Sequence, residues 1–207
     1  MTQPSSSGSP QGAHAAGAGH DGSLDPFLGK PIMELQEIYA DERFPNVVAA
    51  MDGTILATWG AQTVLSRRSR DGGATWETPV AIGPGMHAGG VTVDDISGEV
   101  LAFVHPQHPT RDGSLTPRVV YRSADAGQSW TAADATFEAD VNGYVPALHF
   151  AEHGITLRHG AHAGRLMRPA RVYLPDNAYN TAIFSDDRGR TWQCSTPFPV
   201  LGTGEGA

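Results

Sequence analysis

Two histidines of this sequence stand where an imidazole could do chemistry. His87 lies in the glycine-rich segment Gly85–Gly90, and His153 directly precedes Gly154. Because imidazole titrates near neutral pH, a loop histidine can donate a hydrogen bond to a hydroxyl group or serve as a general acid or base. A surface loop histidine with no such role is the simpler alternative at both positions.

Arg43 and Glu205 are two further candidates, and residue type alone does not decide either of them. An arginine can bind an anionic ligand, but Arg43 could equally pair at the surface with Asp41 or Glu42. Glu205 lies in a glycine-rich segment and could simply be solvated. Whether Arg43 and Glu205 have a functional role depends on the strands and motifs in which they lie.

Composition excludes several classes of protein. The 207 residues carry a formal net charge of −8 and no basic run, whereas binding nucleic-acid phosphates requires a lysine and arginine footprint. Cys194 is the single cysteine, which excludes an intrachain disulfide and a cysteine-rich metal site. No residues have zinc-ligand spacing, so we expect neither a metal nor a cofactor. No apolar run is long enough to cross a membrane.

The N-terminal residues differ in composition from the rest. Residues 1–24 are rich in Gly, Ser and Ala and cannot bury apolar surface, so we expect a disordered tail followed by one domain over residues 25–207. The tail lacks a basic segment followed by an apolar one, which predicts no secretory signal peptide. The cytoplasm is then the default location, with secretion as the alternative.

An eight-residue pattern, S-x-D-x-G-x-[ST]-W, occurs three times and organises the domain. The octets begin at residues 69, 123 and 185, and a period of this size is typical of a propeller or solenoid. In each, Ser and Asp can bond the turn backbone, Gly permits a positive φ, and Trp packs on apolar neighbours. The defining residues are Ser69, Asp71, Gly73, Trp76, Ser123, Asp125, Gly127, Trp130, Ser185, Asp187, Gly189 and Trp192.

Short strand-like runs surround the octets, and no helix of three turns is evident. Each octet is predicted to be a hairpin turn between antiparallel strands, with about four strands per repeat, as in a propeller blade. The expected strands include residues 46–50, 54–59, 63–68, 90–93, 100–104, 118–122, 147–150, 154–158, 165–167 and 181–184. The sequence thus predicts an all-β propeller of four-stranded antiparallel blades.

The octets resemble the Asp boxes (BNR repeats) of the sialidase (neuraminidase) superfamily, whose fold is a six-bladed β-propeller. Arg43-Phe44-Pro45 is similar to the R-[I/F]-P motif that begins the first sialidase blade. Residues 154–157 with 164–169 resemble a third-blade G-I-x-L…G-R-L-x-x-P pattern, and residues 202–205 resemble the G-x-G-E segment. The resemblance covers about residues 33–207. In the family the Asp boxes lie away from the active site, so they indicate the fold rather than the chemistry.

The resemblance implies an exo-α-sialidase, a glycoside hydrolase that removes terminal sialic acid from a glycan. Such enzymes use a tyrosine nucleophile, because a carboxylate would be repelled by the substrate's own carboxylate. A glutamate activates the tyrosine, an aspartate serves as acid and base, and three arginines bind the substrate carboxylate. By this resemblance Arg43 would be the first of those arginines and Glu205 the activating glutamate, with His87 and His153 as substrate contacts.

The sequence departs from the family where the catalytic aspartate is expected. The link Trp59–Gln62, after the second strand of the first blade, contains no carboxylate. Asp52, Asp94 and Asp95 are the nearest carboxylates, and each is more simply explained by a turn. Strand alternation also predicts that most of Arg158, Arg165, Arg168 and Arg171 face solvent.

Six blades of this period need roughly 330–370 residues, so residues 25–207 suffice for about three. The nucleophilic tyrosine and the remaining arginines would follow the G-x-G-E segment. We therefore expect the N-terminal half of a sialidase-like protein, inactive by itself, whose exposed blade face could support self-association. The alternatives are a non-catalytic Asp-box propeller that binds glycans or proteins, and a related hydrolase of another sugar.

Overall fold

β-Strands account for all the regular secondary structure of the described residues. The computed structural model describes residues 35–39, 44–148 and 152–199. The chain divides into one unit over residues 1–37 and a second over residues 38–207, and the following description concerns the second. The expected tail over residues 1–24 lies outside the described residues. Within them there is no helix, as the sequence predicts.

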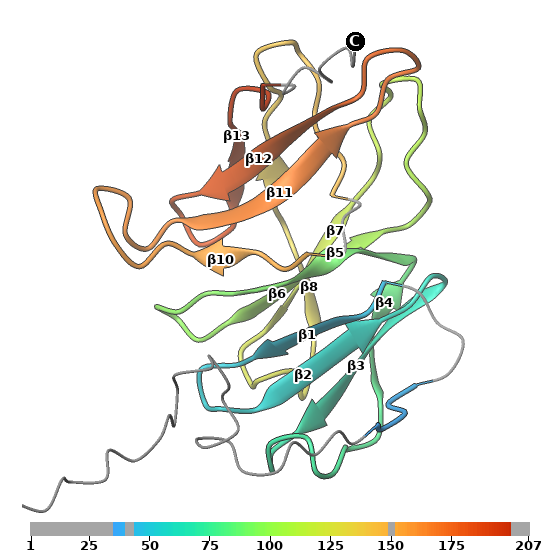
Figure 1. Cartoon of the computed structure of the whole chain (residues 1–207), viewed down its shortest axis with the longest axis vertical. Coiled ribbons are helices and arrows are strands. Elements are labelled where there is room, and N and C mark those ends of the chain that lie inside the picture. Colours follow the sequence, from blue (N-terminus) through green and yellow to red (C-terminus); the bar gives the residue numbers. More distant parts are fainter. Residues whose placement is uncertain (1–34, 40–43, 149–151, 200–207) are drawn as a thin grey trace, which may run out of the picture. The chain divides into compact units, whose positions relative to one another are not determined.

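The first two sheets are four-stranded antiparallel meanders (Figure 1). Sheet I contains β1 (Asn46–Ala49), β2 (Ile55–Trp59), β3 (Thr63–Ser69) and β4 (Val80–Pro84) in sequence order. Sheet II repeats this order with β5 (Met86–Val93), β6 (Val100–His105), β7 (Val119–Ser123) and β8 (Thr131–Ala133). Consecutive meanders of this kind are the blades that the repeat predicts.

Sheet III has the same meander with one additional strand. It contains β10 (Ile155–Thr156), β11 (Leu166–Val172), β12 (Tyr179–Ser185) and β13 (Thr191–Cys194). The additional strand, β9 (Thr136–Phe137), pairs in parallel with β13 and covers an edge that would otherwise be unpaired. The strand expected over residues 147–150 forms only an isolated bridge, between Ala147 and Arg171, and residues 149–151 are outside the described part.

The three octets adopt one and the same hairpin turn, as predicted. They join β3 to β4, β7 to β8 and β12 to β13, each pair antiparallel. In the first octet the Ser69 hydroxyl donates to Asp71 Oδ1 (2.8 Å) and accepts from the Gly73 amide (2.8 Å). The other two octets repeat these bonds at 2.7 Å. Hydrogen bonds from the Thr75 hydroxyl and amide, and then from Ser69, lower the pKa of Asp71 to about 2.

The second and third octets also bind the preceding sheet. In the second octet the Trp130 indole N–H donates to Ser66 Oγ of β3 (3.0 Å). In the third octet, Arg122 of β7 donates through Nη2 to the carbonyl oxygen of Arg188 (2.6 Å). The sequence predicted only that the octet tryptophan packs on apolar neighbours. These contacts show that the turn also joins neighbouring blades.

The octet glycines give a test of this joining role. All three have a positive φ, at 94°, 79° and 77° for Gly73, Gly127 and Gly189. An alanine Cβ at Gly127 or Gly189 would lie 2.5 Å from a leucine methyl of the preceding sheet, whereas at Gly73 the nearest atom is the Trp76 ring at 3.9 Å. We expect all three alanine variants to lose about 1–2 kcal/mol from the left-handed backbone.

In Gly127→Ala and Gly189→Ala the free energy of unfolding should fall by about a further 1–3 kcal/mol, which is the usual cost of overpacking a core site. Urea denaturation of the three variants measures this difference, with Gly73→Ala as the matched control. Equal losses of unfolding free energy at all three positions would contradict the joining role.

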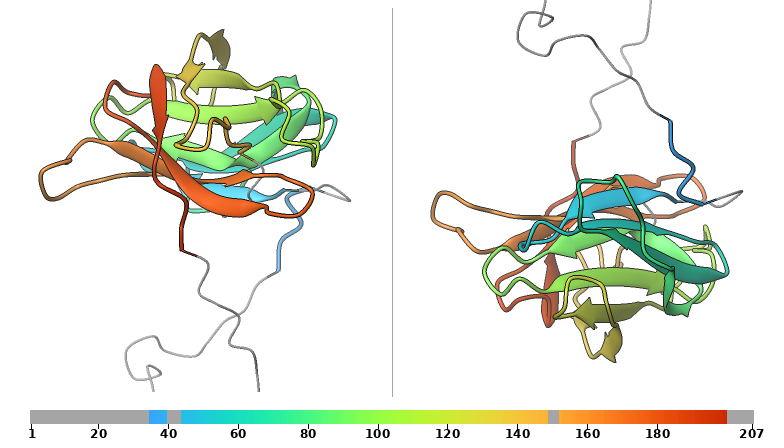
Figure 2. Two further views of the ribbon diagram at one scale, coloured as in Figure 1. Left: turned by 90° about the horizontal axis from the view of Figure 1, so that it is seen from above. Right: turned by 90° about the horizontal axis from the view of Figure 1, so that it is seen from below.

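Two apolar cores lie between the sheets, which follow one another from sheet I to sheet III in Figure 1 and are seen from above and below in Figure 2. One core joins sheets I and II around Leu56, Val91 and Val104. The other joins sheets II and III around Phe103, Ile183 and Trp192. The stacking of blades therefore rests on apolar burial, and the octet turns reinforce it.

Candidate functional site

The first strands of the three sheets run in the same direction, and β1 and β10 begin beside Val91 and Thr92 of β5. Next to β1, Phe44 contacts His87 of β5, and Asn46 contacts Val91 further along β5. Next to β10, Gly154 forms a parallel bridge with Thr92. We call the region where β1, β5 and β10 begin the strand-start edge. Because the strands of each meander alternate in direction, the octet turns lie at the opposite end of the sheets.

His87 lies inside β5 at this edge, fully buried, rather than on an exposed loop. Its Nδ1 is 3.1 Å from the carbonyl oxygen of Phe44. A carbonyl can only accept, so Nδ1 carries the proton and Nε2 is unprotonated. Burial, and then the charge of Arg168, lower the pKa of His87 to about 4. The imidazole is therefore neutral at physiological pH and supports the residue that follows Arg43.

Arg168 of β11 lies beneath the same edge and is also fully buried. Its guanidinium group donates to the carbonyl oxygens of Ala88 (2.7 Å), Gly89 and Gly90 (3.4 Å), and lies 3.9 Å from the centre of the Phe103 ring. Burial lowers its pKa to about 9, so the group stays charged near neutral pH. Sequence reasoning predicted that strand alternation would expose most of four arginines, and for Arg168 this is wrong because its face of β11 packs on β5 and β6.

A surface hollow of about 220 Å³ opens at the strand-start edge. Phe44 and Met86 line it, together with Ala61 of the β2–β3 link. Gln107 and His108, from the segment after β6, complete the wall, and the His108 Nδ1 donates to the carbonyl oxygen of Pro109 (2.8 Å). Sequence reasoning missed Gln107 and His108. The proline-flanked run Pro106–Pro109 directly after a buried strand was the signal that could have shown them.

His105 fixes the segment that carries these two residues. It is fully buried, its Nδ1 donates to the carbonyl oxygen of Pro117 (2.7 Å), and its Nε2 accepts from the Leu148 amide (3.1 Å). Both ring nitrogens are thus used by the backbone, which defines a neutral tautomer. His105 is a structural histidine, and the side chain available to a ligand in this segment is the exposed His108.

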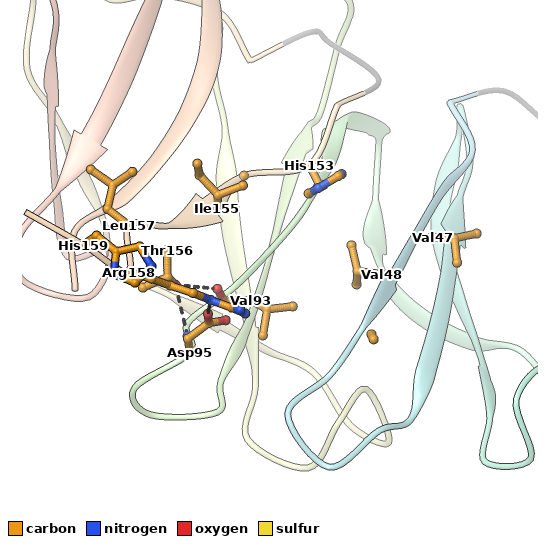
Figure 3. A pocket seen from close by; sticks show the side chains of 12 residues that line it. Val47, Val48, Val93, Asp95, His153, Ile155, Thr156, Leu157, Arg158 and His159 are labelled. Atoms are coloured by element: carbon orange, nitrogen blue, oxygen red, sulfur yellow. Dashed lines mark hydrogen bonds and ion pairs between the residues drawn. The ribbon is translucent and has the colours of Figure 1, made fainter. Parts of the chain in front are cut away.

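A larger open cleft, of about 600 Å³, runs along the first strands (Figure 3). One wall is β1 with Val47 and Val48, and the other is the β10 segment, as Figure 3 shows. His153 is exposed and lines this cleft. Further along, the Arg158 Nε donates to Asp95 (2.6 Å). The structure thus places His153 near the strand-start edge with its imidazole accessible.

The three aspartates considered as acid/base residues all lie in turns at the octet end of the sheets. Asp52 accepts from the Thr54 amide (2.9 Å) in the β1–β2 turn. Asp94 is buried and accepts from Ser97 and from Arg188, and Asp95 is paired with Arg158. Their turn assignment is therefore confirmed. The β2–β3 link is held by its backbone, since the Gly60 carbonyl accepts from the His87 amide (2.9 Å).

Three of the described tyrosines have a raised pKa. Burial raises the pKa of Tyr39 and Tyr173. Burial, and then a hydrogen bond to Asp140, raise that of Tyr179 to about 12. An activated tyrosine needs a base that draws its pKa down. These three tyrosines therefore favour the protonated, structural state.

Arg43 and Glu205 lie outside the described residues. Phe44, the neighbour of Arg43 in sequence, is bonded to His87 at the strand-start edge. Among the described residues, no three His, Cys, Asp or Glu side chains gather as a metal-ligand set. Over the same residues, the chain contains no helix with the length and apolar character needed to span a membrane.

The neutral state of His87 leads to a prediction about acid stability. An unfolded histidine binds a proton with a pKa of 6.5, whereas native His87 does so only near 4, so acid favours the unfolded chain. The neutral His87 contributes about 3 kcal/mol to the free energy of unfolding. This contribution is fully present above pH 6.5 and is lost as the pH falls toward 4.

Comparison with known sequences places the chain near the sialidases, although no protein-family model matches it. It is 27% identical over 212 residues to a sialidase of Micromonospora viridifaciens, an alignment that covers 83% of this chain and 32% of that protein. It is 34% identical over 96 residues to sialidase-4 of Homo sapiens, covering 40% and 19% respectively. The chain therefore spans about a third or less of the length of these relatives.

Solved structures give the same result for the fold. The Hadza microbial sialidase Hz136 matches with a TM-score of 0.56 and 20% identity, over 76% of this chain and 38% of that one. The sialidase of Trypanosoma rangeli in complex with sialic acid matches with a TM-score of 0.51 and 19% identity, over 78% and 31%. At these identities the likeness shows a shared propeller fold, of which the three sheets are blades.

Proposed function

We propose that this chain, a homologue of sialidases that shares their fold, supplies part of the active site of an exo-α-sialidase. Its homology supports a glycoside hydrolase of sialidase type. The specific proposal is that terminal sialic acid binds at the strand-start edge, with its carboxylate held by Arg43. Glu205 would activate a tyrosine nucleophile further along a longer chain.

One observation carries this proposal. The hydrogen bond between His87 and the Phe44 carbonyl holds Phe44, which follows Arg43 in sequence, at the strand-start edge. A clamp arginine must be held in place to bind a carboxylate, because a mobile side chain loses entropy on binding. The exposed His153 and His108 lie near the same edge as possible donors to sugar hydroxyls.

The β2–β3 link favours a second candidate function, a propeller that binds glycans without cleaving them. The expected acid/base aspartate is absent from this link, and the three nearest aspartates belong to turns at the other end of the sheets. Without a carboxylate in this link, proton donation to the leaving group falls to a residue from another segment or is missing. A sialic acid site would then bind its ligand and release it unchanged. Self-association through an exposed blade face stays a prediction.

Two measurements on this chain distinguish these functions. Saturation-transfer NMR with sialic acid reports binding, and a fluorogenic sialoside reports hydrolysis, with the corresponding β-galactoside as a neutral control substrate. We expect sialic acid to bind and the 207-residue chain to release little fluorophore. Hydrolysis of the sialoside without hydrolysis of the β-galactoside would establish sialidase activity. Binding of neither sialic acid nor the sialoside would overturn both functions.

A further inference from the structure

Arg168 is a buried cation that pairs with no carboxylate of the described residues. Six ion pairs occur among the described residues, and Arg168 takes part in none of them. A buried charge of this kind costs several kcal/mol of desolvation unless polar groups replace its water shell. Three carbonyl oxygens accept from its Nη1 and Nη2 and the face of Phe103 covers the group, while its buried Nε has no hydrogen-bond partner among the described residues.

The three carbonyls belong to one irregular stretch of β5. His87 pairs with Val104 and Val91 with Ala102, so Ala88–Gly90 oppose a single residue of β6. Gly89 and Gly90 both have positive φ, at 74° and 68°. A bulge with two left-handed residues turns successive carbonyls away from the strand ladder. Arg168 therefore binds the carbonyls of the three residues that lie outside the regular pairing of β5 with β6.

This bulge touches the other two first strands. On one side, His87 precedes it and donates to the Phe44 carbonyl. On the other side, Gly90 packs so tightly that an added Cβ would lie 2.8 Å from the backbone of Glu152 and His153. The backbone that carries Phe44, and the backbone that carries His153, are therefore both located by the shape of Ala88–Gly90.

We propose that Arg168 is the positioning residue of the strand-start edge. By holding the carbonyls of Ala88–Gly90, its guanidinium group fixes His87 beneath Phe44 and seats the backbone of His153 against Gly90. Arg168 acts through these residues and does not touch a ligand. The positional part of this inference stands independently, and only its effect on ligand affinity rests on the proposed function.

The shape of the side chain explains why an arginine is used. A guanidinium group is planar and presents several donors in a fixed fork, whereas lysine offers one nitrogen and methionine none. Replacing a buried charged group by an apolar one of similar volume is often neutral for stability or stabilising. A stability measurement alone would therefore not report positioning, and a structural readout is needed.

The test compares Arg168→Met and Arg168→Lys with the control Arg165→Met. Arg165 precedes the same strand but pairs with Asp186 and stacks on Phe184, away from the bulge. Backbone amide NMR is recorded for each variant, together with the ring ¹⁵N signals of His87 across pH. Sialic acid affinity is measured in parallel.

In both Arg168 variants we expect the amides of Phe44, Asn46 and residues 152–154 to shift. In Arg168→Met, which removes the neighbouring charge, the pKa of His87 should also rise toward its ordinary value. Sialic acid affinity should fall about tenfold. The control should change only amides near residues 184–186. A folded Arg168 variant, of either type, with unchanged amides at Phe44, Asn46 and residues 152–154 would overturn the inference. If the wild-type chain binds no sialic acid, the proposed function fails while the amide comparison still decides the role of Arg168.

Discussion

Trp192→Ala should lower the free energy of unfolding by about 3–5 kcal/mol, the range found for removal of a large buried aromatic side chain. Trp192 is fully buried between sheets II and III. Its ring packs edge-on against Phe103 at a centroid distance of 5.4 Å and is stacked with Phe137 at 6.2 Å. The indole N–H also donates to the Gly189 carbonyl (3.1 Å). Because a domain is stable by about 5–15 kcal/mol, this one change should remove a large part of its stability.

The chain provides matched controls at the other two octets. Trp76 occupies the same position of the pattern but is only half-buried, and Trp130 is partly buried against the core of sheets I and II. The loss for alanine variants should therefore decrease in the order Trp192, Trp130, Trp76. Urea denaturation measures the midpoints, and an unchanged slope would show that each variant still unfolds in one step. A Trp76→Ala loss as large as that of Trp192→Ala would contradict the packing described here.

Acid should destabilise the protein by about 3 kcal/mol through His87 alone, as the pH falls from 6.5 to 4. Burial is the first cause of the lowered pKa, and the charge of Arg168 is the second. Protonation would place a second cation beside Arg168 without solvent, so the native state resists it while the unfolded chain does not. The contribution of this residue is constant above pH 6.5 and is progressively lost below it.

His87→Asn isolates this effect, since the asparagine amide can still donate to the Phe44 carbonyl but does not titrate. The difference in unfolding free energy between wild type and variant should be flat above pH 6.5 and shrink toward pH 4. Carboxylates such as Asp71 are present in both proteins and cancel in the difference. Parallel stability curves for the two proteins would show that His87 does not titrate as described.

Much of the fold could be predicted from local sequence. The hydrogen bonds that form each octet turn join Ser, Asp and Gly residues at most four positions apart. The octet pattern was therefore sufficient to predict three hairpins and the period of the blades. Alternating apolar residues likewise predicted most strands. The parallel strand β9 was not predicted, because its pairing with β13 joins residues more than 50 positions apart.

The site was less predictable, for a physical reason. His87 looks like a loop residue in sequence because glycines surround it, yet those glycines form a bulge inside a buried strand. Arg168 looks like an exposed strand residue because charged side chains are rarely buried. Its burial depends on carbonyls of a strand almost 80 residues away, which no local pattern contains. The sequence motifs could indicate Arg43 and Glu205 but not the buried His87 and Arg168.

The central claim is that the strand-start edge binds sialic acid through its carboxylate and Arg43. Calorimetric titration with the methyl glycoside of sialic acid, and with the methyl ester of that glycoside, tests it most directly. A charge-assisted arginine contact is worth about 1.5–3 kcal/mol, so the ester and the Arg43→Met variant should each bind about 10- to 100-fold more weakly. The ester should show no further loss in Arg43→Met. Equal affinity of the wild-type chain for acid and ester would contradict the account.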